Sequence, residues 1–385
     1  MRRSLFNEDH EAFRATLRDF IAREVEPFHP EWEKAGHVPR ELYRKLGALG
    51  ILGIEVPEEY GGAGQTSIRY MAVMAEECAR AGVTLGTVGV HAGLLLHYLV
   101  EYGTEEQKKR WLPGCVSGDI WTAIAMTEPG TGSDLAGIST RATLSEDGSS
   151  YVLNGAKTFI TGGGLADVVI VVCRTSPPSP DDRRTGLSLL CVETTSEGFA
   201  VGRRLDKIGM KASDTAELSF TDVEVPVDNL LGQEGRAFEH LRHNLIRERL
   251  QIAIEAAAEA RAAIDFTVRY VQDRTAFGER LSSFQNTKFV LAGCAAEAEA
   301  AQTMMDRAVE LFDAGELTSA DAAKVKLVCT ETVGRIVDKC LQLHGGYGYI
   351  LEYPIARLYA AVRANRIYGG SSEVLKTVIA KSLGL

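Results

Sequence analysis

The sequence feature that most constrains the fold is a stretch at residues 234–271 that is almost free of Gly and Pro. Ala, Leu, Ile, Glu and Arg are common in it, and most of these residues favour helix. A single helix over the whole stretch would be roughly 55 Å long at 1.5 Å per residue. Because only neighbouring helices can cover a helix of that length, the stretch predicts a helical bundle.

Partner helices for this stretch follow it in the sequence. Residues 283–313 and 318–343 have a similar composition, and shorter helical patterns lie near 354–362 and 372–382. Long helices joined by short connections pack side by side in alternating directions. We therefore expect an antiparallel four-helix bundle in the C-terminal part of the chain.

In the remainder of the chain the spacing of the apolar residues changes near residue 120. Before that point apolar residues recur at helical spacing, as in Phe13, Leu17 and Phe20, and Thr104 with Gln107 predicts a capping box at a helix start. From 121 to 230 short β-rich runs alternate with Gly, Asp, Ser and Pro, which is typical of strands and turns. The runs are YVLNGAKTFIT (151–161), DVVIVVCR (167–174), GLSLLCVE (186–193) and ELSFTDVEV (217–225), and the polar, Pro-rich stretch 174–186 predicts an exposed loop. A chain of 385 residues also exceeds what one core usually holds, about 250 to 300 residues. We expect an α+β multidomain fold with a helical N-terminal domain (1–120), a middle β-barrel or sheet domain (121–230) and a C-terminal helical bundle domain (231–385).

The charge balance and the apolar runs exclude several classes of protein. Lys plus Arg number 42 against 52 for Asp plus Glu, a net charge of −10 that disfavours nucleic acid and anionic membranes as partners. No apolar run approaches the roughly 18 residues that span a bilayer, so we expect no membrane insertion. The 7 cysteines form no CxxC pair, and the chain starts with charged residues rather than an apolar signal core. These features favour a cytoplasmic protein.

Common cofactor and hydrolase motifs are missing from the sequence. GAGQTS (62–67) and GTGSDL (130–135) lack the third glycine of a dinucleotide-binding loop and its βαβ setting. HExxH, a P-loop and GxSxG with suitable partners are also missing, which disfavours zinc hydrolases, P-loop enzymes and serine hydrolases. His240 and His243 lie three residues apart beside Glu239, but no further ligand cluster accompanies them, so we expect no metal site.

The segment AMTEPGTGSD (125–134) carries three hydroxyl side chains around a Gly-rich turn. Thr127, Thr131 and Ser133, together with exposed backbone donors, could approach a polar ring or a phosphate closely. A plain connection from helix to strand explains the same composition, and it is the commoner case in large proteins.

This segment and six further blocks resemble the acyl-CoA dehydrogenase family, in order along nearly the whole chain. The blocks are KTFITGG (157–163), RLDKIGMKASDTAEL (204–218), RERLQIA (247–253), YVQDRTAFGERLSSFQNTKFVLA (270–292), LQLHGGYGYILEYPIARLY (341–359) and RIYGGSSEVLK (366–376). Ordered blocks are far more specific than a single motif. The resemblance implies a helical N-terminal domain, a β-barrel middle domain and a four-helix C-terminal bundle, and these agree with the sections derived above.

The resemblance also implies FAD as the cofactor. Met126, Thr127 and Ser133 match the residues that border the flavin ring and the thioester tail. Phe159 and Thr161 match the positions where the family stacks an aromatic side chain on the ring and hydrogen-bonds its N5 atom. Trp is frequent at the first of these positions, and Phe still provides an aromatic cover.

A second set of residues matches the family segment that reaches into a neighbouring subunit to hold the pyrophosphate and adenosine of FAD. This set is Arg274, Phe277 and Gln285. A guanidinium fork suits phosphate oxygens, although a helix-end arginine could instead pair with Asp273 or Glu279. Because the implied FAD site is shared between subunits, the resemblance also implies a homotetramer.

Two more groups match FAD contacts of the family. The glycines of the first group permit a close approach of the backbone to the pyrophosphate. The second group is explained almost as well by a simple helix N-cap with a Glu in the first turn. The first group is Gln342, Leu343, His344, Gly345 and Gly346, and the second is Ser371, Ser372 and Glu373.

The resemblance places the catalytic base on the long helix. Oxidation of an acyl thioester needs a carboxylate to take the α proton while the β hydrogen leaves as hydride to the flavin. Many family members use the Glu of a YEG[TS] sequence, but the matching residue here is Gly369. Long-chain and isovaleryl-CoA dehydrogenases instead carry the base in an ERL sequence, which matches Glu248. The alternative is a solvated glutamate between Arg247 and Arg249.

The implied activity is FAD-dependent α,β-dehydrogenation of an acyl-CoA to the trans-2-enoyl thioester, within fatty acid β-oxidation, with electrons passed to an electron-transfer flavoprotein. Ser133, Arg249 and Gly370 are the implied substrate-binding residues. An acyl-carrier-protein thioester is an alternative substrate. A flavin oxidase or monooxygenase needs no α-proton base, so Glu248 disfavours it. A non-enzymatic scaffold is disfavoured by the intact flavin blocks.

Overall fold

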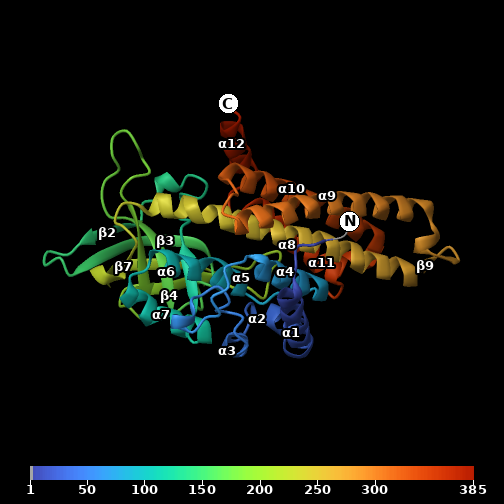
Figure 1. Cartoon of the computed structure of the whole chain (residues 1–385), viewed down its shortest axis with the longest axis horizontal. Coiled ribbons are helices and arrows are strands. Elements are labelled where there is room, and N and C mark those ends of the chain that lie inside the picture. The colour runs from blue at the N-terminus through green and yellow to red at the C-terminus, as the bar shows by residue number, and fades with distance from the viewer. Residues whose placement is uncertain (1–2) are drawn as a thin grey trace.

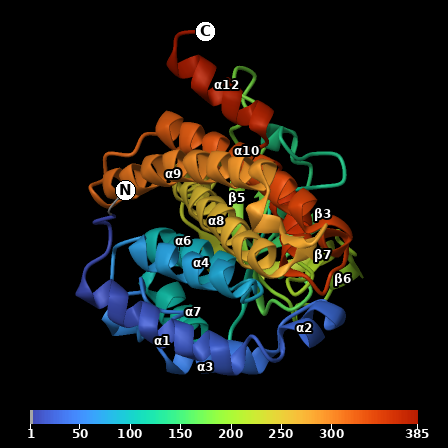
Figure 2. The same cartoon turned by 90° about the vertical axis from the view of Figure 1, so that its right-hand side faces the viewer.

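The computed structural model describes residues 3–385 and contains a helical N-terminal part, a β-sheet and a bundle of long helices (Figure 1). Both views place α12 on the opposite side of the molecule from α1 and α3, with the long helices between them (Figure 2). The helices that precede the sheet are α1 (Glu8–Glu24), α2 (His29–Ala35), α3 (Arg40–Ala48), α4 (Arg69–Ala81), α5 (Val88–Val90), α6 (Leu96–Tyr102) and α7 (Glu105–Ser117). Within the described residues, no helix is long and apolar enough to cross a membrane.

The sheet is mixed and has two long central strands. Its strands are β1 (Thr122–Ala125), β2 (Arg141–Leu144), β3 (Ser150–Thr161), β4 (Val168–Arg174), β5 (Leu187–Glu193), β6 (Phe199–Arg204), β7 (Thr215–Pro226) and β8 (Leu230–Leu231). Their order is β6-β7-β3-β2-β4-β5-β8, and β1 pairs with β4. Val168 and Ile170 face a core shared with α6 and α7, whereas Val169 and Val171 face the core between the strands. Because both faces of β4 are covered, this strand is a continuous apolar run.

The predicted helices of the bundle are confirmed with small shifts at their ends. They are α8 (Ala237–Asp273), α9 (Gln285–Asp313), α10 (Ser319–His344), α11 (Pro354–Val362) and α12 (Ser372–Ser382). Helix α8 begins three residues later than predicted, after Gly235, whose φ of +75° is not helical. Figure 1 shows α8, α9 and α10 side by side. A short hairpin, β9 (Thr275–Ala276) and β10 (Glu279–Arg280), connects α8 to α9.

Alanines allow close packing around α8. Ala253, Ala256, Ala257, Ala260 and Ala263 are buried in one core with side chains of α4 and α10. Small side chains let neighbouring helices approach closely, and this contact covers α8 as its composition predicts.

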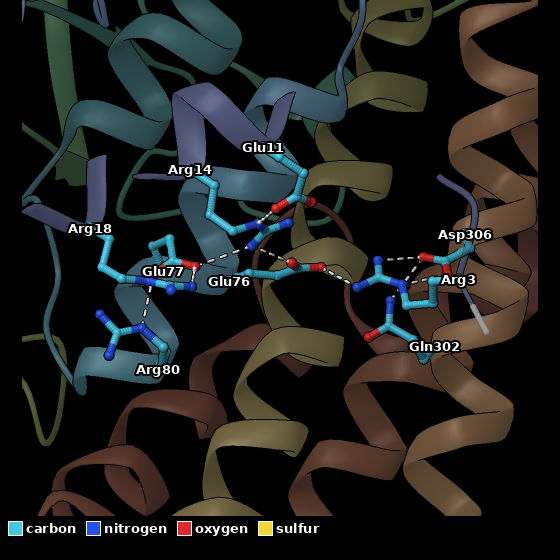
Figure 3. A network of polar contacts seen from close by, with 9 residues as sticks. All are labelled: Arg3, Glu11, Arg14, Arg18, Glu76, Glu77, Arg80, Gln302 and Asp306. Carbon is cyan, nitrogen blue, oxygen red and sulfur yellow. Dashed lines mark hydrogen bonds and ion pairs between the residues drawn. The ribbon is translucent and has the colours of Figure 1, made fainter. Parts of the chain in front are cut away.

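A network of ion pairs fastens α1 to α4 and α9 (Figure 3). Glu77 on α4 is buried, and it accepts hydrogen bonds from Arg18 at 2.8 Å and from Arg80 at 2.8 Å. Burial raises the pKa of Glu77, but the hydrogen bonds from Arg18, Arg80 and Arg14 outweigh this effect and lower the pKa to about 2. The network continues through Glu76 and Arg3 to Asp306.

Two local predictions are confirmed. Thr104 and Gln107 form the predicted capping box at the start of α7, each side chain accepting a hydrogen bond from the other residue's backbone N–H. Most of the predicted loop at 174–186 is exposed. The domain boundaries after residues 120 and 230 stay predictions.

Candidate active site

A cleft of about 1490 Å³ lies between α4, α8, the end of β3 and the turn that precedes α12. A volume of this size exceeds what one drug-sized ligand requires. Many of the site residues expected from the sequence line this cleft, although they come from separate segments. They are Met126, Thr127, Ser133, Phe159, Thr161, Glu248, Arg249, Gly370 and Ser371.

A buried ion pair fixes the Gly-rich loop that carries Met126, Thr127 and Ser133. Lys157 on β3 is fully buried and donates to the Glu128 carboxylate at 2.9 Å and to the Met126 carbonyl at 3.0 Å. Burial raises the pKa of Glu128, but hydrogen bonds from residues 139 and 140 and from Lys157 lower it to about 2. Neither member of this pair was predicted from the sequence, and the apolar strand pattern around Lys157 is a signal that indicates the burial of that residue.

Phe159 offers an aromatic face to the cleft. It lies where the pairing of β3 with β7 shifts register between Lys157 and Ile160, and its φ is +59°. Its side chain is 68% exposed, although it is a large hydrophobic residue. A left-handed conformation is costly for a side chain of this size, and it persists only where the surroundings impose it.

The Gly-rich loop lies beside β3, where the backbone N–H of Thr158 donates to the carbonyl of Thr127 at 2.9 Å. Gly132 of this loop lines the cleft, and a Cβ there would have only one neighbour within 4 Å, Cγ2 of Thr127 at 4.0 Å. Together with the uncovered ring of Phe159, this space fits a flavin.

Glu248 places a carboxylate in the cleft. A Cβ built on Gly369 would lie 3.4 Å from its Oε1 atom, so the carboxylate faces the turn that precedes α12. Among residues 3–385 no side chain forms a hydrogen bond with it. Burial raises the pKa of Glu248, and this effect exceeds the opposing influence of Lys326 and Arg249. The alternative of a solvated helix glutamate does not fit this position, because Glu248 is half-buried and lines the cleft.

The neighbouring Gly369 has no room for a side chain. Its φ is +64°, and a Cβ there would lie 2.4 Å from Cδ1 of Ile252. A residue with a side chain at this position would be strained and would crowd the carboxylate of Glu248.

Two cations hold the turn around Gly369. Lys326 on α10 is fully buried and donates to the carbonyls of Tyr368 and Gly370, each at 2.7 Å. Burial lowers the pKa of Lys326 to about 8, although Glu248 opposes the shift. Arg249 donates to the carbonyl of Gly369 at 3.4 Å.

Lys326 was not predicted from the sequence, because a lysine in a helix usually lies at the surface. Its spacing was a usable signal, since Ala322, Cys329 and Val333 occupy the same buried helix face.

A second group of expected residues lies away from the cleft, at the C-terminal end of α8 and in the hairpin that leads to α9. Figure 1 shows β9 at the end of the bundle that lies away from the sheet. Within the described residues Arg274 forms no ion pair, so the expected alternatives Asp273 and Glu279 are not its partners. Its guanidinium carbon lies 5.4 Å from the ring centre of Tyr347. Phe277 is 97% exposed with a φ of +54°, and Gln285 is the first residue of α9.

The expected pyrophosphate segment, Gln342 to Gly346, lies at the same end of the bundle, where α10 ends. His344 stacks on Tyr270 with ring centres 4.3 Å apart. No atom lies within 4 Å of the positions that a Cβ of Gly345 or Gly346 would occupy, so their backbone is open to a ligand. Gln342 and Leu343 belong to the last turn of α10.

The final group forms the start of α12. The side chain of Ser371 accepts a hydrogen bond from the backbone N–H of Val374, so the expected N-cap is present. Ser372 donates to Glu331 at 2.8 Å, and Glu373 is exposed in the first turn.

The two helix histidines have ordinary neighbours. His240 packs against the ring of Tyr102 with centres 4.1 Å apart, and His243 lies 3.3 Å from Glu101. In the described part of the chain no group of three or more His, Cys, Asp or Glu is placed to hold a metal ion.

Comparison with known proteins identifies the family. The chain matches the models of the acyl-CoA dehydrogenase N-terminal domain (7–119), middle domain (123–223) and C-terminal domain (235–384). It therefore belongs to the acyl-CoA dehydrogenase family, and it is an FAD-dependent oxidoreductase with the acyl-CoA dehydrogenase fold.

Individual relatives are similar to this protein over nearly the whole length of its chain. The mitochondrial long-chain specific acyl-CoA dehydrogenase of Sus scrofa is 42% identical over 381 residues, which is 99% of this chain and 88% of the relative. The crystal structure of an acyl-CoA dehydrogenase from Geobacillus kaustophilus has a TM-score of 0.96 and 44% identity and covers 100% of both chains. An acyl-CoA dehydrogenase from Bacillus anthracis complexed with FAD has a TM-score of 0.90 and 32% identity, over 98% of this chain and 67% of that chain.

Proposed function

We propose that this chain oxidises the α,β bond of an acyl-CoA thioester to the trans-2-enoyl thioester, with Glu248 as the base. The observation that carries the proposal is the carboxylate of Glu248, which has no described hydrogen-bond partner and faces Gly369 in the cleft. FAD, when bound, supplies the acceptor for the β hydrogen as hydride. Glu248 takes the α proton, and its raised pKa brings its basicity closer to neutral pH.

The other cleft residues hold the reactants. Met126, Thr127, Phe159 and Thr161 would hold the flavin, and the open backbone at the Gly-rich loop supports this assignment. Ser133, Arg249 and Gly370 would hold the thioester, since they line the same cleft as Glu248. The carrier is CoA in this proposal, and faster flavin bleaching by an acyl-carrier-protein thioester than by the matched CoA thioester would contradict this choice.

The FAD site spans two copies of the chain in this proposal, within a homotetramer. Arg274, Phe277 and Gln285, together with Gln342 to Gly346, lie outside the cleft of their own chain. An exposed aromatic side chain and an unpaired guanidinium are suited to a ligand held by another copy. Ser371, Ser372 and Glu373 would complete the site at the start of α12.

An electron-transfer flavoprotein is the proposed acceptor of the electrons, and the location is cytoplasmic. The resemblance to the family supports the acceptor. All seven cysteines are free, and this supports a reducing compartment. Cell fractionation would test the location, and recovery in another compartment would contradict it.

Replacing Glu248 by Gln tests the proposed base. The variant keeps its shape, so FAD content and acyl-CoA binding should persist, while reductive bleaching of the flavin falls by about 10² to 10⁴-fold. Anaerobic stopped-flow absorbance measures the bleaching. Asp265→Asn, an exposed carboxylate on the same helix, is the control and should bleach normally. A rate for Glu248→Gln within about threefold of wild type would remove Glu248 from the mechanism.

Replacing Lys326 by Met tests whether this cation positions the base. Lys326 lowers the pKa of Glu248, so its loss should raise that pKa and move the acid limb of the kcat/KM profile up by about one pH unit. Lys326→Arg keeps the charge and should restore the limb in part. Lys324→Met, on the same helix but half-exposed, is the control. If the acid limb of the kcat/KM profile does not shift in the folded, flavin-loaded variant, Lys326 has a structural role only.

Arg274→Ala tests the shared FAD site. Loss of one charge-assisted phosphate contact, worth about 1.5 to 3 kcal/mol, should weaken flavin retention while the protein stays folded. The ratio of flavin to protein absorbance measures occupancy, and Arg280→Ala in the neighbouring hairpin is the control. Full occupancy in Arg274→Ala would contradict the assignment.

The acceptor is tested by steady-state turnover. Rates with an electron-transfer flavoprotein or a ferrocenium dye should greatly exceed the rate with air, because a dehydrogenase protects its reduced flavin from oxygen. Peroxide formed at the dye-coupled rate would favour the oxidase alternative.

A further inference from the structure

Two more glutamates line the same wall of the cleft as Glu248. Glu255 and Glu259 follow it on α8 by seven and eleven residues, and both line the cleft. Residues at this spacing share one face of a helix. At 1.5 Å per residue they lie roughly 10 and 16 Å along the helix from Glu248. They are therefore placed beside the part of an acyl chain that lies far from its thioester.

Neither of these carboxyl groups has a cation as a partner within the described chain. Glu255 accepts one hydrogen bond, a long one of 3.4 Å from the Gln251 amide, and that amide also donates to the carbonyl of Gly89 at 2.8 Å. Glu259 accepts one hydrogen bond of 2.8 Å from Asn365. The buried glutamates outside the cleft differ, because Glu55, Glu77 and Glu128 each pair with an arginine or a lysine.

Gly89 lies beside the carboxyl of Glu255 and also lines the cleft. A Cβ there would lie 3.5 Å from Oε1 of Glu255 and 3.2 Å from Nε2 of Gln251. A side chain at this position would therefore crowd the carboxyl of Glu255, and a glycine does not. Met74, Cys78 and Leu85 line the same cavity, and they would be enough to hold a plain hydrocarbon chain.

Burial also acts on the protonation of both groups. It raises the pKa of Glu255 to about 7. It raises the pKa of Glu259 to about 8, with a smaller contribution from Glu255. A hydrocarbon end placed against these groups would remove their remaining solvent without providing a hydrogen bond, which is unfavourable.

We propose that Glu255 and Glu259 bind a hydrogen-bond donor, a hydroxyl or an amine, at the end of the acyl chain away from the thioester. The preferred substrate is then an acyl thioester with a polar end rather than a plain fatty acyl thioester. This inference rests on the proposed function, because it places the thioester beside Glu248. Glu255 and Glu259 act as specificity-determining residues and take no part in the proton transfer.

A panel of matched thioesters tests the proposal on the flavin-loaded enzyme. For hexanoyl, octanoyl and decanoyl chains, the unsubstituted CoA thioester is compared with its ω-hydroxy, ω-amino and ω-methoxy forms. The methoxy group has a similar size to the donors but cannot donate a hydrogen bond. For at least one chain length, the hydroxy or amino form should have a kcat/KM at least about tenfold above the other two. A plain or methoxy chain that is equally good at every length would overturn the proposal.

The same panel separates this inference from the proposed function. If no thioester bleaches the flavin, the proposed function fails. If plain chains bleach it best, only the inference fails. Calorimetric Kd values for the Glu248→Gln protein provide a second readout that does not depend on turnover, and they should show the same order of preference.

Variants of the two glutamates complete the test. Glu255→Leu combined with Glu259→Leu should abolish the advantage of the donor-bearing chains and raise kcat/KM for the plain chain. Glu255→Gln combined with Glu259→Gln serves if the leucine variant does not fold, and it should reduce the preference for the amine by about tenfold or more. Glu316→Leu, at an exposed position after α9, is the matched control. Unchanged preferences in the folded variants would overturn the proposal.

Discussion

The packing of α8 is the constraint on which the rest of the structure depends. A helix of 37 residues can be buried only if other helices cover it, and its alanines let α4 and α10 approach closely. The face that these helices do not fill borders the cleft and carries Glu248, Glu255 and Glu259. One rigid element therefore fixes the relative positions of all three carboxyl groups, and a rigid helix holds such groups more accurately than a loop would.

The turn before α12 depends on buried cations as well as on its two glycines. Gly369 and Gly370 both have positive φ, and the carbonyls on either side accept hydrogen bonds from Lys326. A buried ammonium is favourable only when it is well hydrogen-bonded, so the turn and the lysine stabilise each other. The hydrogen bonds to these carbonyls offset the free-energy cost of burying the Lys326 ammonium. The same ammonium is a positive neighbour for the carboxylate of Glu248.

The sequence was sufficient for the long elements and insufficient for the contacts between them. Uninterrupted composition predicts α8 to α12 closely, and the apolar runs predict β3, β4, β5 and β7. Strands β1 and β2 were missed because four residues carry too little periodicity, and β6 because it is largely exposed. The cleft residues from Met126 to Ser371 could be named only through family resemblance. The burial of Lys157 and Lys326 could have been inferred from the apolar patterns around them, but their partners, among them the carbonyls of Met126 and Tyr368, lie on distant segments that no residue pattern identifies.

The neighbours of the three α8 glutamates give them different chemical characters. Lys326 and Arg249 lie beside Glu248 and oppose the effect of burial, which raises its pKa. No described cation pairs with Glu255 or Glu259, and burial raises their pKa values to about 7 and about 8. The cleft therefore combines a carboxyl group with two cationic neighbours near the turn with carboxyl groups further along α8 that are partly protonated at neutral pH. This arrangement separates a group that accepts a proton from groups that bind a polar chain end, although all three are the same residue on the same helix face.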